Sequence, residues 1–153
     1  MAFFNDYLLD KLCIFTVFVI GKEEFMAKIL VVDDDPDFVE ITRIILENND
    51  YEVVSASDSN EAIEKMRIET PDLVLLDIMM SQPLDGVEVS KKMLEDDTLR
   101  KVPIIVVSSI TDSPHLAEFP SDEYLPLDDW ITKPAQPEEL LAKVKKHLER
   151  FNN

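Results

Sequence analysis

Acidic, hydroxyl and basic side chains recur in this sequence directly after short apolar segments. Three consecutive aspartates at residues 33–35 follow the first segment, and Asp77, Ser108 and Lys133 follow or adjoin later ones. Crowded carboxylates repel one another and favour a hard divalent cation such as Mg²⁺. A lysine and a hydroxyl facing the same point can neutralise a phosphoryl group that one carboxylate attacks, which gives an aspartyl phosphate. These residue types therefore indicate phosphoryl transfer, provided that the fold brings them together.

Apolar and amphipathic segments alternate from residue 27 onward. The pattern predicts strands at 28–32, 53–55, 73–76, 104–107 and 130–131, and helices at 37–48, 60–68, 87–94 and 137–151. In the first helix, the stripe expected to face the core consists of Phe38, Ile41, Ile44 and Ile45. Continuously apolar strands that alternate with helices indicate a parallel α/β sheet with right-handed crossovers and helices on both faces.

In such a sheet, ligands bind beyond the carboxyl ends of the strands. Asp33, Asp77, Ser108 and Lys133 all stand at this place in the sequence, so neighbouring strands would bring them to one cleft. Each residue alone has a simpler explanation, because aspartates before Pro36 suit a helix cap and a single lysine is usually solvated. Their joint placement at strand ends favours a functional site.

The charge of the chain restricts its partners. Its 153 residues include Lys+Arg 15 and Asp+Glu 32, which gives a formal net charge of -17. Such a charge repels nucleic acid and anionic lipid, so nucleic acid is not expected as a partner and membrane binding is disfavoured. The single cysteine cannot form an internal disulfide, and the chain lacks zinc-ligand spacing, which predicts a cytoplasmic protein.

The first 25 residues differ from the rest. Their apolar run at 12–20 is about half the length of a membrane span, and Asp6 and Asp10 stand where a signal peptide is basic. Residues 1–25 are therefore interpreted as an extra helix or strand, or as the product of a start codon assigned too early. The second hypothesis places the start at Met26, because residues 21–24 require purine-rich codons like those of a bacterial ribosome-binding site. The folded domain is predicted to cover 26–153.

Several motifs, in order, resemble those of the receiver domains of two-component response regulators. They are KILVVDDDPD, PDLVLLDIMM, PIIVVSS and DDWITKP, and the resemblance covers nearly all of the chain after residue 25. It implies a flavodoxin-like, doubly wound (βα)5 fold whose five-stranded parallel sheet has the order 2-1-3-4-5. It further implies that Asp77 is phosphorylated and that Mg²⁺ is bound by Asp33, Asp34, Asp77 and the backbone carbonyl of Met79.

The same resemblance assigns roles to three further residues. Lys133 and Ser108 would assist the phosphorylation of the chain itself, and Ser108 and Trp130 would form the switch that follows. The implied partners are a histidine kinase or phosphotransfer protein and an unknown downstream protein. The chain is thus predicted not to be an enzyme, apart from its own Mg²⁺-dependent phosphorylation and a slow dephosphorylation. The slow rate is expected because Met79 and Ile110, at positions that influence hydrolysis in relatives, are both apolar.

The match to the receiver pattern has two departures. The segment 77–86 is longer than usual, and 108–133 is longer and contains Pro114, Pro120 and Pro126. Prolines at this spacing forbid one long helix, so the fourth helix of the fold is predicted to be short or remodelled. The peptide bond before Pro134 is expected to be cis, as is usual in the family.

Other functions stay open beside a single-domain response regulator that acts by docking. The first alternative is a receiver-like module that binds its partner regardless of phosphorylation. A small Mg²⁺-dependent phosphohydrolase is a second, but Met79 stands where an acid/base aspartate is expected. A calcium loop is rejected because Phe38 occupies the position that needs glycine. His115 and His147 are interpreted as residues of a loop and a surface helix, without a role as ligand or phosphoryl donor.

Overall fold

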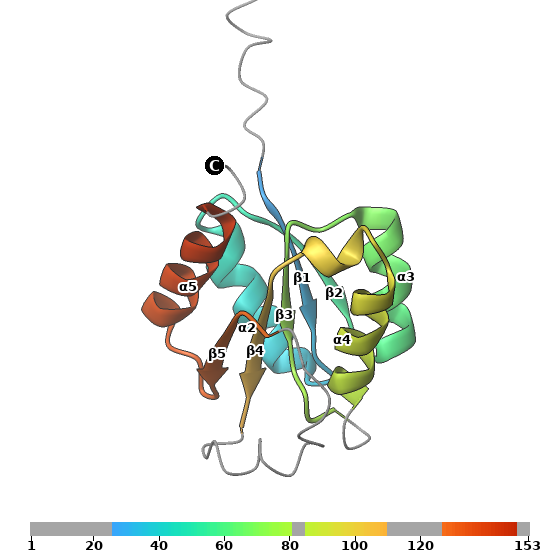
Figure 1. The fold of residues 1–153 in the computed structure, drawn as a ribbon. Helices are drawn as coiled ribbons and strands as arrows, with labels where there is room; N and C mark the ends of the chain where they lie inside the picture. The colour runs from blue at the N-terminus through green and yellow to red at the C-terminus, as the bar shows by residue number, and fades with distance from the viewer. Residues whose placement is uncertain (1–25, 81–84, 110–126, 150–153) are drawn as a thin grey trace, which may run out of the picture.

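The computed structural model describes residues 26–80, 85–109 and 127–149. Along the chain the elements are β1 (Lys28–Val32), α2 (Pro36–Glu47), β2 (Glu52–Ala56), α3 (Ser59–Glu69), β3 (Leu73–Leu76), α4 (Asp85–Glu95), a 3₁₀ helix, η1 (Leu99–Lys101), β4 (Ile104–Ser108), β5 (Asp129–Thr132) and α5 (Pro137–Glu149). All pairs of strands are parallel, and the sheet order is β2-β1-β3-β4-β5. This topology confirms the predicted doubly wound α/β fold (Figure 1).

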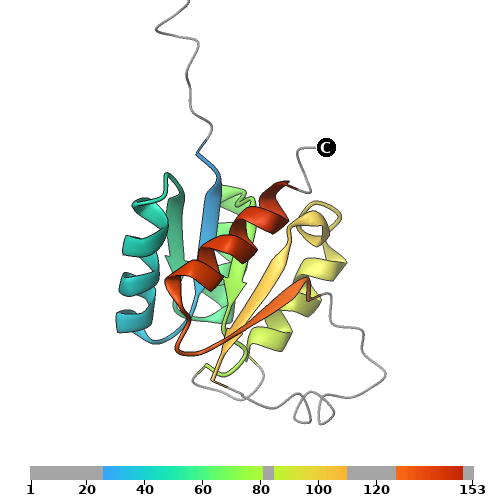
Figure 2. The same ribbon diagram turned by 90° about the vertical axis from the view of Figure 1, so that its left-hand side faces the viewer.

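Helices cover both faces of the sheet. Helices α2 and α5 lie on one face, and α3 and α4 lie on the other (Figures 1 and 2). Alternate residues of a strand serve the two cores: Leu30 and Val32 pack with α3 and α4, whereas Ile29 and Val31 pack with α2 and α5. Because both faces are covered, β3 is apolar throughout, and β1 and β4 contain the continuous apolar runs 29–32 and 104–107, as the sequence pattern predicted.

The acidic turn after β1 also begins α2. Asp35 is the N-cap, and its carboxylate accepts hydrogen bonds from the backbone N–H groups of Asp37 and Phe38 at 3.0 and 3.3 Å. Pro36 takes the first helical position, where its missing N–H costs nothing. The helix-cap interpretation is therefore correct for Asp35, and Asp33 also takes part in the turn, because its Oδ1 accepts a hydrogen bond from the backbone N–H of Asp35 at 2.9 Å.

The predicted buried stripe of α2 is wrong at two positions. Ile41 and Ile44 are exposed, whereas Thr42 and Leu46 are buried and Phe38 and Ile45 are half-buried. A helix presents only a narrow stripe to a sheet, and here the small Thr42 lies within that stripe between the larger side chains. Two isoleucines thus remain on the outer face of α2.

Basic side chains reach the outer strand β2 from both neighbouring helices. Arg43 Nη1 of α2 donates to the carbonyl of Val53 at 3.0 Å, and Lys65 Nζ of α3 donates to the carbonyl of Ser55 at 2.6 Å. Carbonyls on the free side of an edge strand need such donors or water.

Several predictions fall partly or wholly outside the described residues. These are the N-terminal segment 1–25, the turn at 81–84, the proline-containing segment 110–126 with Ile110 and His115, and the last two residues of the helix predicted at 137–151. Among the described helices, none combines the length and the apolar character needed to cross a membrane.

Candidate functional site

The acidic residues meet because β1 and β3 are neighbours in register. Val32 pairs with Leu76, so the next residue of each strand, Asp33 and Asp77, lies at the same edge of the sheet. The backbone N–H of Asp77 donates to the carbonyl of Val32 at 2.9 Å, which fixes this proximity. Carboxylate oxygens of Asp33, Asp34 and Asp77 all lie within 4.8 Å of one another. The geometry therefore forms the predicted acidic cluster.

The three carboxylates differ in exposure. Asp33 and Asp77 are buried, with 2% and 6% of their surfaces exposed, whereas Asp34 is exposed to solvent. Burial raises the pKa of Asp33, although hydrogen bonds from Lys133 and from the backbone N–H of Asp35 act in the opposite direction. A divalent cation beside these oxygens would favour their charged form. Oxygen ligands with this arrangement suit Mg²⁺.

Lys133 provides positive charge at the centre of the cluster. Its Nζ lies 2.5 Å from Asp33 Oδ2 and 3.0 Å from Asp77 Oδ2. The same ammonium stands 4.2 Å from the centroid of the Phe38 ring, which is a cation–π distance. Burial would lower the pKa of Lys133, but the hydrogen bonds from its ammonium to the two carboxylates outweigh it and raise that pKa. The peptide bond before Pro134 is cis, as expected.

Ser108 is the last residue of β4, which borders β3 in the sheet. Ser108 is fully buried, and its carbonyl accepts a hydrogen bond from the backbone N–H of Lys133 at 2.9 Å. Ser108 also pairs with Thr132, the last residue of β5. The strand register therefore ties Ser108 directly to the segment that positions the lysine.

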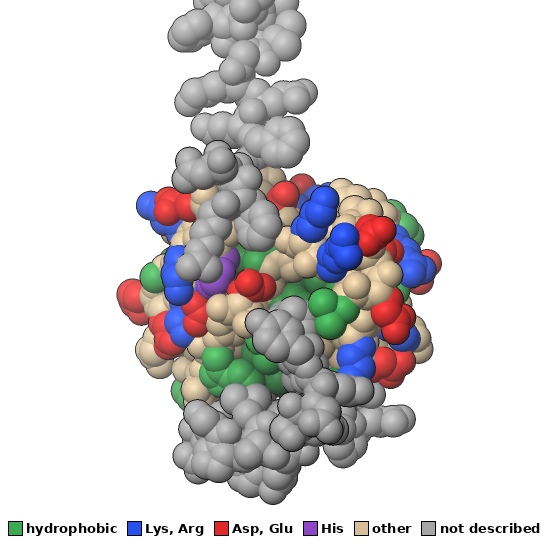
Figure 3. All heavy atoms as spheres, in the orientation of Figure 1, with side chains coloured by type: hydrophobic (Ala, Val, Ile, Leu, Met, Phe, Trp, Pro, Cys, Tyr) green, Lys and Arg blue, Asp and Glu red, His purple; other side chains and the backbone are tan. Residues whose placement is uncertain are grey.

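Met79 and Trp130 flank this centre. The backbone N–H of Met79 donates to Asp77 Oδ1 at 2.8 Å, and its side chain is 47% exposed. Trp130 is half-buried and packs against a small apolar cluster that contains Ile78, Val87 and Val106. Figure 3 shows hydrophobic side chains gathered near the carboxyl ends of β4 and β5, among mixed acidic and basic groups. The indole is thus placed beside the residue that follows Asp77 in the chain.

Sequence reasoning missed the surroundings of three residues. Phe38 was interpreted only as a core residue, although its ring also faces the ammonium of Lys133. Gly86 was not singled out, but a Cβ there would lie 2.4 Å from the carbonyl oxygen of Asp77. His147 was interpreted as a surface residue and is instead 1% exposed, with Nε2 2.9 Å from Asp129 Oδ2. The rarity of glycine in the chain was the one available signal for Gly86.

Comparison with known proteins decides the family. The sequence model described as "Response regulator receiver domain" matches residues 29–145. The chain belongs to this family. A receiver is a signalling module of two-component systems rather than an enzyme, and the acidic cluster lies where its phosphorylated aspartate site is expected.

Relatives and solved structures agree with the family match. The receiver is 39% identical over 127 residues to the alkaline phosphatase synthesis transcriptional regulatory protein PhoP of Bacillus subtilis, covering 80% of this chain and 49% of PhoP. It is 35% identical over 127 residues to the DNA-binding response regulator MtrA of Mycolicibacterium smegmatis, covering 80% and 51%. The chain therefore spans about half the length of these relatives.

Two solved structures match this protein over nearly their whole length. The receiver superposes on a two-component response regulator from Clostridium difficile with a TM-score of 0.72 and 30% identity, covering 84% of this chain and 100% of the other. It superposes on the chemotaxis protein CheY4 of Vibrio cholerae with a TM-score of 0.70 and 27% identity, covering 79% and 98%. The fold is therefore shared with these two proteins.

Proposed function

We propose that this receiver accepts a phosphoryl group on Asp77 from a histidine kinase or phosphotransfer protein, and that phosphorylation changes a protein-binding face. The observation that carries the proposal is the contact of one ammonium, Lys133, with both Asp33 and Asp77 beside a third carboxylate. A phosphoryl group requires such fixed positive charge near an attacking carboxylate.

The transfer forms one bond and breaks another. A carboxylate oxygen of Asp77 attacks phosphorus, the P–N bond to the donor histidine breaks, and the imidazole leaves with a proton from solvent. Lys133 stands within hydrogen-bond distance of Asp77 Oδ2 and would neutralise the oxygens of the arriving group. Ser108, buried at the end of β4, is the second proposed donor and, with Trp130, the proposed switch pair. When Mg²⁺ is bound by Asp33, Asp34, Asp77 and the carbonyl of Met79, it supplies further positive charge.

Phosphorylation by a small donor tests this proposal. The full chain is treated with acetyl phosphate and Mg²⁺, and intact mass is measured before and after hydroxylamine, which cleaves acyl phosphates. We expect the wild type and Asp97→Asn to gain one hydroxylamine-sensitive phosphoryl group, because the side chain of Asp97 is 89% exposed and outside the site. Asp77→Asn should gain none. If the wild type gains no phosphoryl group from acetyl phosphate and none from a histidine kinase, the phosphorylation-independent binding module would be favoured.

Magnesium should stabilise the folded receiver. Binding to the native state alone raises the free energy of unfolding, by about 2.7 kcal/mol at a concentration of 100 Kd. We expect Asp34→Asn to weaken Mg²⁺ affinity by about tenfold or more, because one of the clustered carboxylates is lost. Asp37→Asn, an equal change of charge in the first turn of α2, should retain the Mg²⁺-dependent rise in Tm. Equal Mg²⁺ responses of the two variants in thermal denaturation would contradict the assignment of Asp34.

The aspartyl phosphate is expected to be long-lived. The exposed side chain of Met79 has no polar group that could orient an attacking water, and Ile110 is equally apolar. Met79→Asn with Ile110→Glu should therefore accelerate loss of the phosphoryl group by about tenfold or more, since a fully positioned acid or base group typically contributes about 10²–10⁴-fold. Ile68→Asn, a change of an exposed residue on α3, is the control. The lifetime is measured after removal of the donor, and an unchanged lifetime in the double variant would refute the explanation.

The output is proposed to be a protein contact in the cytoplasm. The net charge of -17 opposes contact between the receiver and nucleic acid phosphates, although the relative MtrA is named as DNA-binding. The single cysteine is consistent with a reducing compartment.

A further inference from the structure

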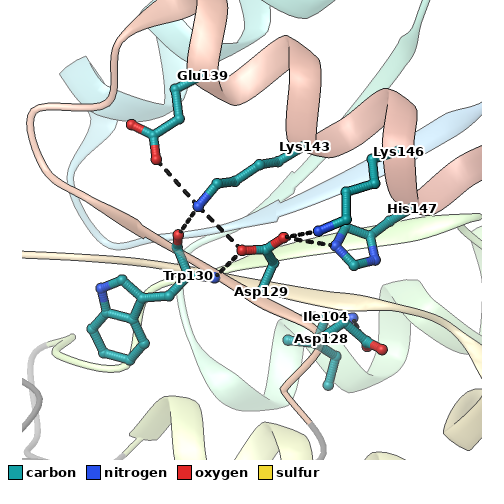
Figure 4. A network of polar contacts seen from close by, with 8 residues as sticks. All are labelled: Ile104, Asp128, Asp129, Trp130, Glu139, Lys143, Lys146 and His147. Carbon is teal, nitrogen blue, oxygen red and sulfur yellow. Dashed lines mark hydrogen bonds and ion pairs between the residues drawn. The ribbon is translucent and has the colours of Figure 1, made fainter.

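A network of polar side chains joins β5 to α5 on the side of the strand away from β4. Its members are Asp129 and Trp130 of β5 and Glu139, Lys143, Lys146 and His147 of α5 (Figure 4). β5 is the last strand of the sheet order, so only β4 borders it within the sheet. The peptide groups on its other side must find partners elsewhere. The network supplies partners for the peptide groups of Trp130.

Both peptide groups of Trp130 are bonded to this network. Its backbone N–H donates to Asp129 Oδ1 at 2.9 Å, and its carbonyl accepts a hydrogen bond from Lys143 Nζ. The same Nζ lies 3.1 Å from Asp129 Oδ1 and 3.2 Å from Glu139 Oε1. One ammonium therefore holds the backbone of Trp130 and the side chain of its neighbour together.

The carboxylate of Asp129 is the centre of the network. Lys146 Nζ lies 3.1 Å and His147 Nε2 lies 2.9 Å from its Oδ2. Lys143, Lys146 and His147 share one face of α5, because helical residues three and four apart are neighbours. Burial would raise the pKa of Asp129, but hydrogen bonds from His147, the Trp130 amide, Lys146 and Lys143 hold that pKa well below its usual range. The carboxylate thus stays charged and keeps its partners.

The indole of Trp130 points away from this network. Figure 4 shows the ring on the opposite side of the strand from the Asp129 carboxylate. Its apolar neighbours include Ile78, which follows Asp77, and Val87, which follows Gly86. The backbone of this residue is therefore held by α5, while its ring contacts the surroundings of the site.

We propose that Lys143 and Asp129 are positioning residues that fix the backbone of Trp130 to α5, so that phosphorylation of Asp77 moves the indole rather than the strand. This inference rests on the proposed function of Asp77. The same strand leads within three residues to Lys133, whose ammonium contacts the acidic cluster. A fixed strand therefore preserves the position of the lysine while the ring reorients.

The experiment compares the fraction of full-length chains phosphorylated on Asp77 with the change in Trp130 fluorescence. Trp130 is the only tryptophan, so its fluorescence reports the indole, and intact mass reports the fraction phosphorylated by acetyl phosphate. In Lys143→Gln we expect the fluorescence change per phosphorylated chain to fall to about half or less, because the released strand shares the movement. Lys143→Arg should preserve the response, since it keeps the charge and the donors. Lys145→Gln, on an exposed position of the same helix, is the matched control.

Hydrogen exchange separates failure of this inference from failure of the proposed function. Without any phosphoryl donor, the amide of Trp130 should exchange about tenfold faster in Lys143→Gln than in Lys145→Gln, because local opening becomes easier. If the wild type cannot be phosphorylated, the hydrogen-exchange measurement by itself still shows whether Lys143 fixes the strand. Unchanged exchange overturns the inference, and so does an undiminished fluorescence response per phosphorylated chain in Lys143→Gln.

Discussion

Replacing Lys133 by glutamine is expected to slow phosphorylation of Asp77 by about a hundredfold or more, the usual cost of losing one positioned donor in a site of developing charge. The same change should strengthen Mg²⁺ binding, because the ammonium now contacts Asp33 and Asp77 at 2.5 and 3.0 Å and competes for their oxygens. A merely unfolded site would lose both properties. Opposite effects on rate and affinity therefore identify the charge of Lys133 as the cause.

The rate is measured with acetyl phosphate at saturating Mg²⁺, and the affinity by calorimetry with Mg²⁺ alone. Lys145→Gln is the control, because it removes the same charge from a side chain that is 72% exposed on α5. Its rate and Mg²⁺ affinity should equal those of the wild type. A Lys133→Gln variant with the wild-type rate, or with weaker Mg²⁺ binding, would contradict the assigned role.

Replacing Gly86 by alanine is expected to destabilise the fold by about 1–3 kcal/mol, the usual cost of overpacking. The added Cβ would lie 2.4 Å from the carbonyl oxygen of Asp77 and 2.7 Å from Ile78 Cα, and neither backbone atom can move aside as a flexible side chain could. Alanine has a higher helix propensity than glycine, but the gain is only about 1 kcal/mol. The steric clash therefore outweighs it, and the net effect on the free energy of unfolding is destabilising. Displacement of Asp77 should also slow its phosphorylation by about tenfold or more.

Urea denaturation and the acetyl phosphate reaction measure the two effects of Gly86→Ala. Glu88→Ala is the control, since Glu88 is exposed two residues later in the same helix and its substitution should change stability by no more than about 0.5 kcal/mol. If Gly86→Ala equals the wild type in both stability and rate, the close approach of α4 to the end of β3 does not constrain the site.

The sequence was sufficient to predict the acidic cluster because the geometry of a parallel sheet makes strand ends meet. Once the strands ending at Val32 and Leu76 are recognised as neighbours, Asp33 and Asp77 must lie side by side. Strand bounds were correct to within one residue for β1 to β4, and the apolar runs are continuous in β1, β3 and β4. Only the resemblance to receivers gave the sheet order, since periodicity does not determine which strands are adjacent.

Other features depend on tertiary distances that no local pattern contains. Which residues of α2 are buried depends on how the helix lies on the sheet. The polar Thr42 is therefore buried and the apolar Ile41 is exposed, the opposite of what their hydropathy predicts. His147 can be buried because Asp129, on the preceding strand and 18 residues earlier, offers it a carboxylate. The need for glycine at position 86 arises from the close approach of the start of α4 to the backbone of Asp77.

The basic side chains at the two outer strands also affect how the protein behaves in concentrated solution. On β2 the carbonyls of Val53 and Ser55 accept from Arg43 and Lys65, and on β5 the carbonyl of Trp130 accepts from a lysine. An incoming strand from another chain would have to displace these ammonium and guanidinium groups before it could pair. Edge-to-edge aggregation is thereby opposed at both borders of the sheet, and the addition of a strand from a partner protein is opposed for the same reason.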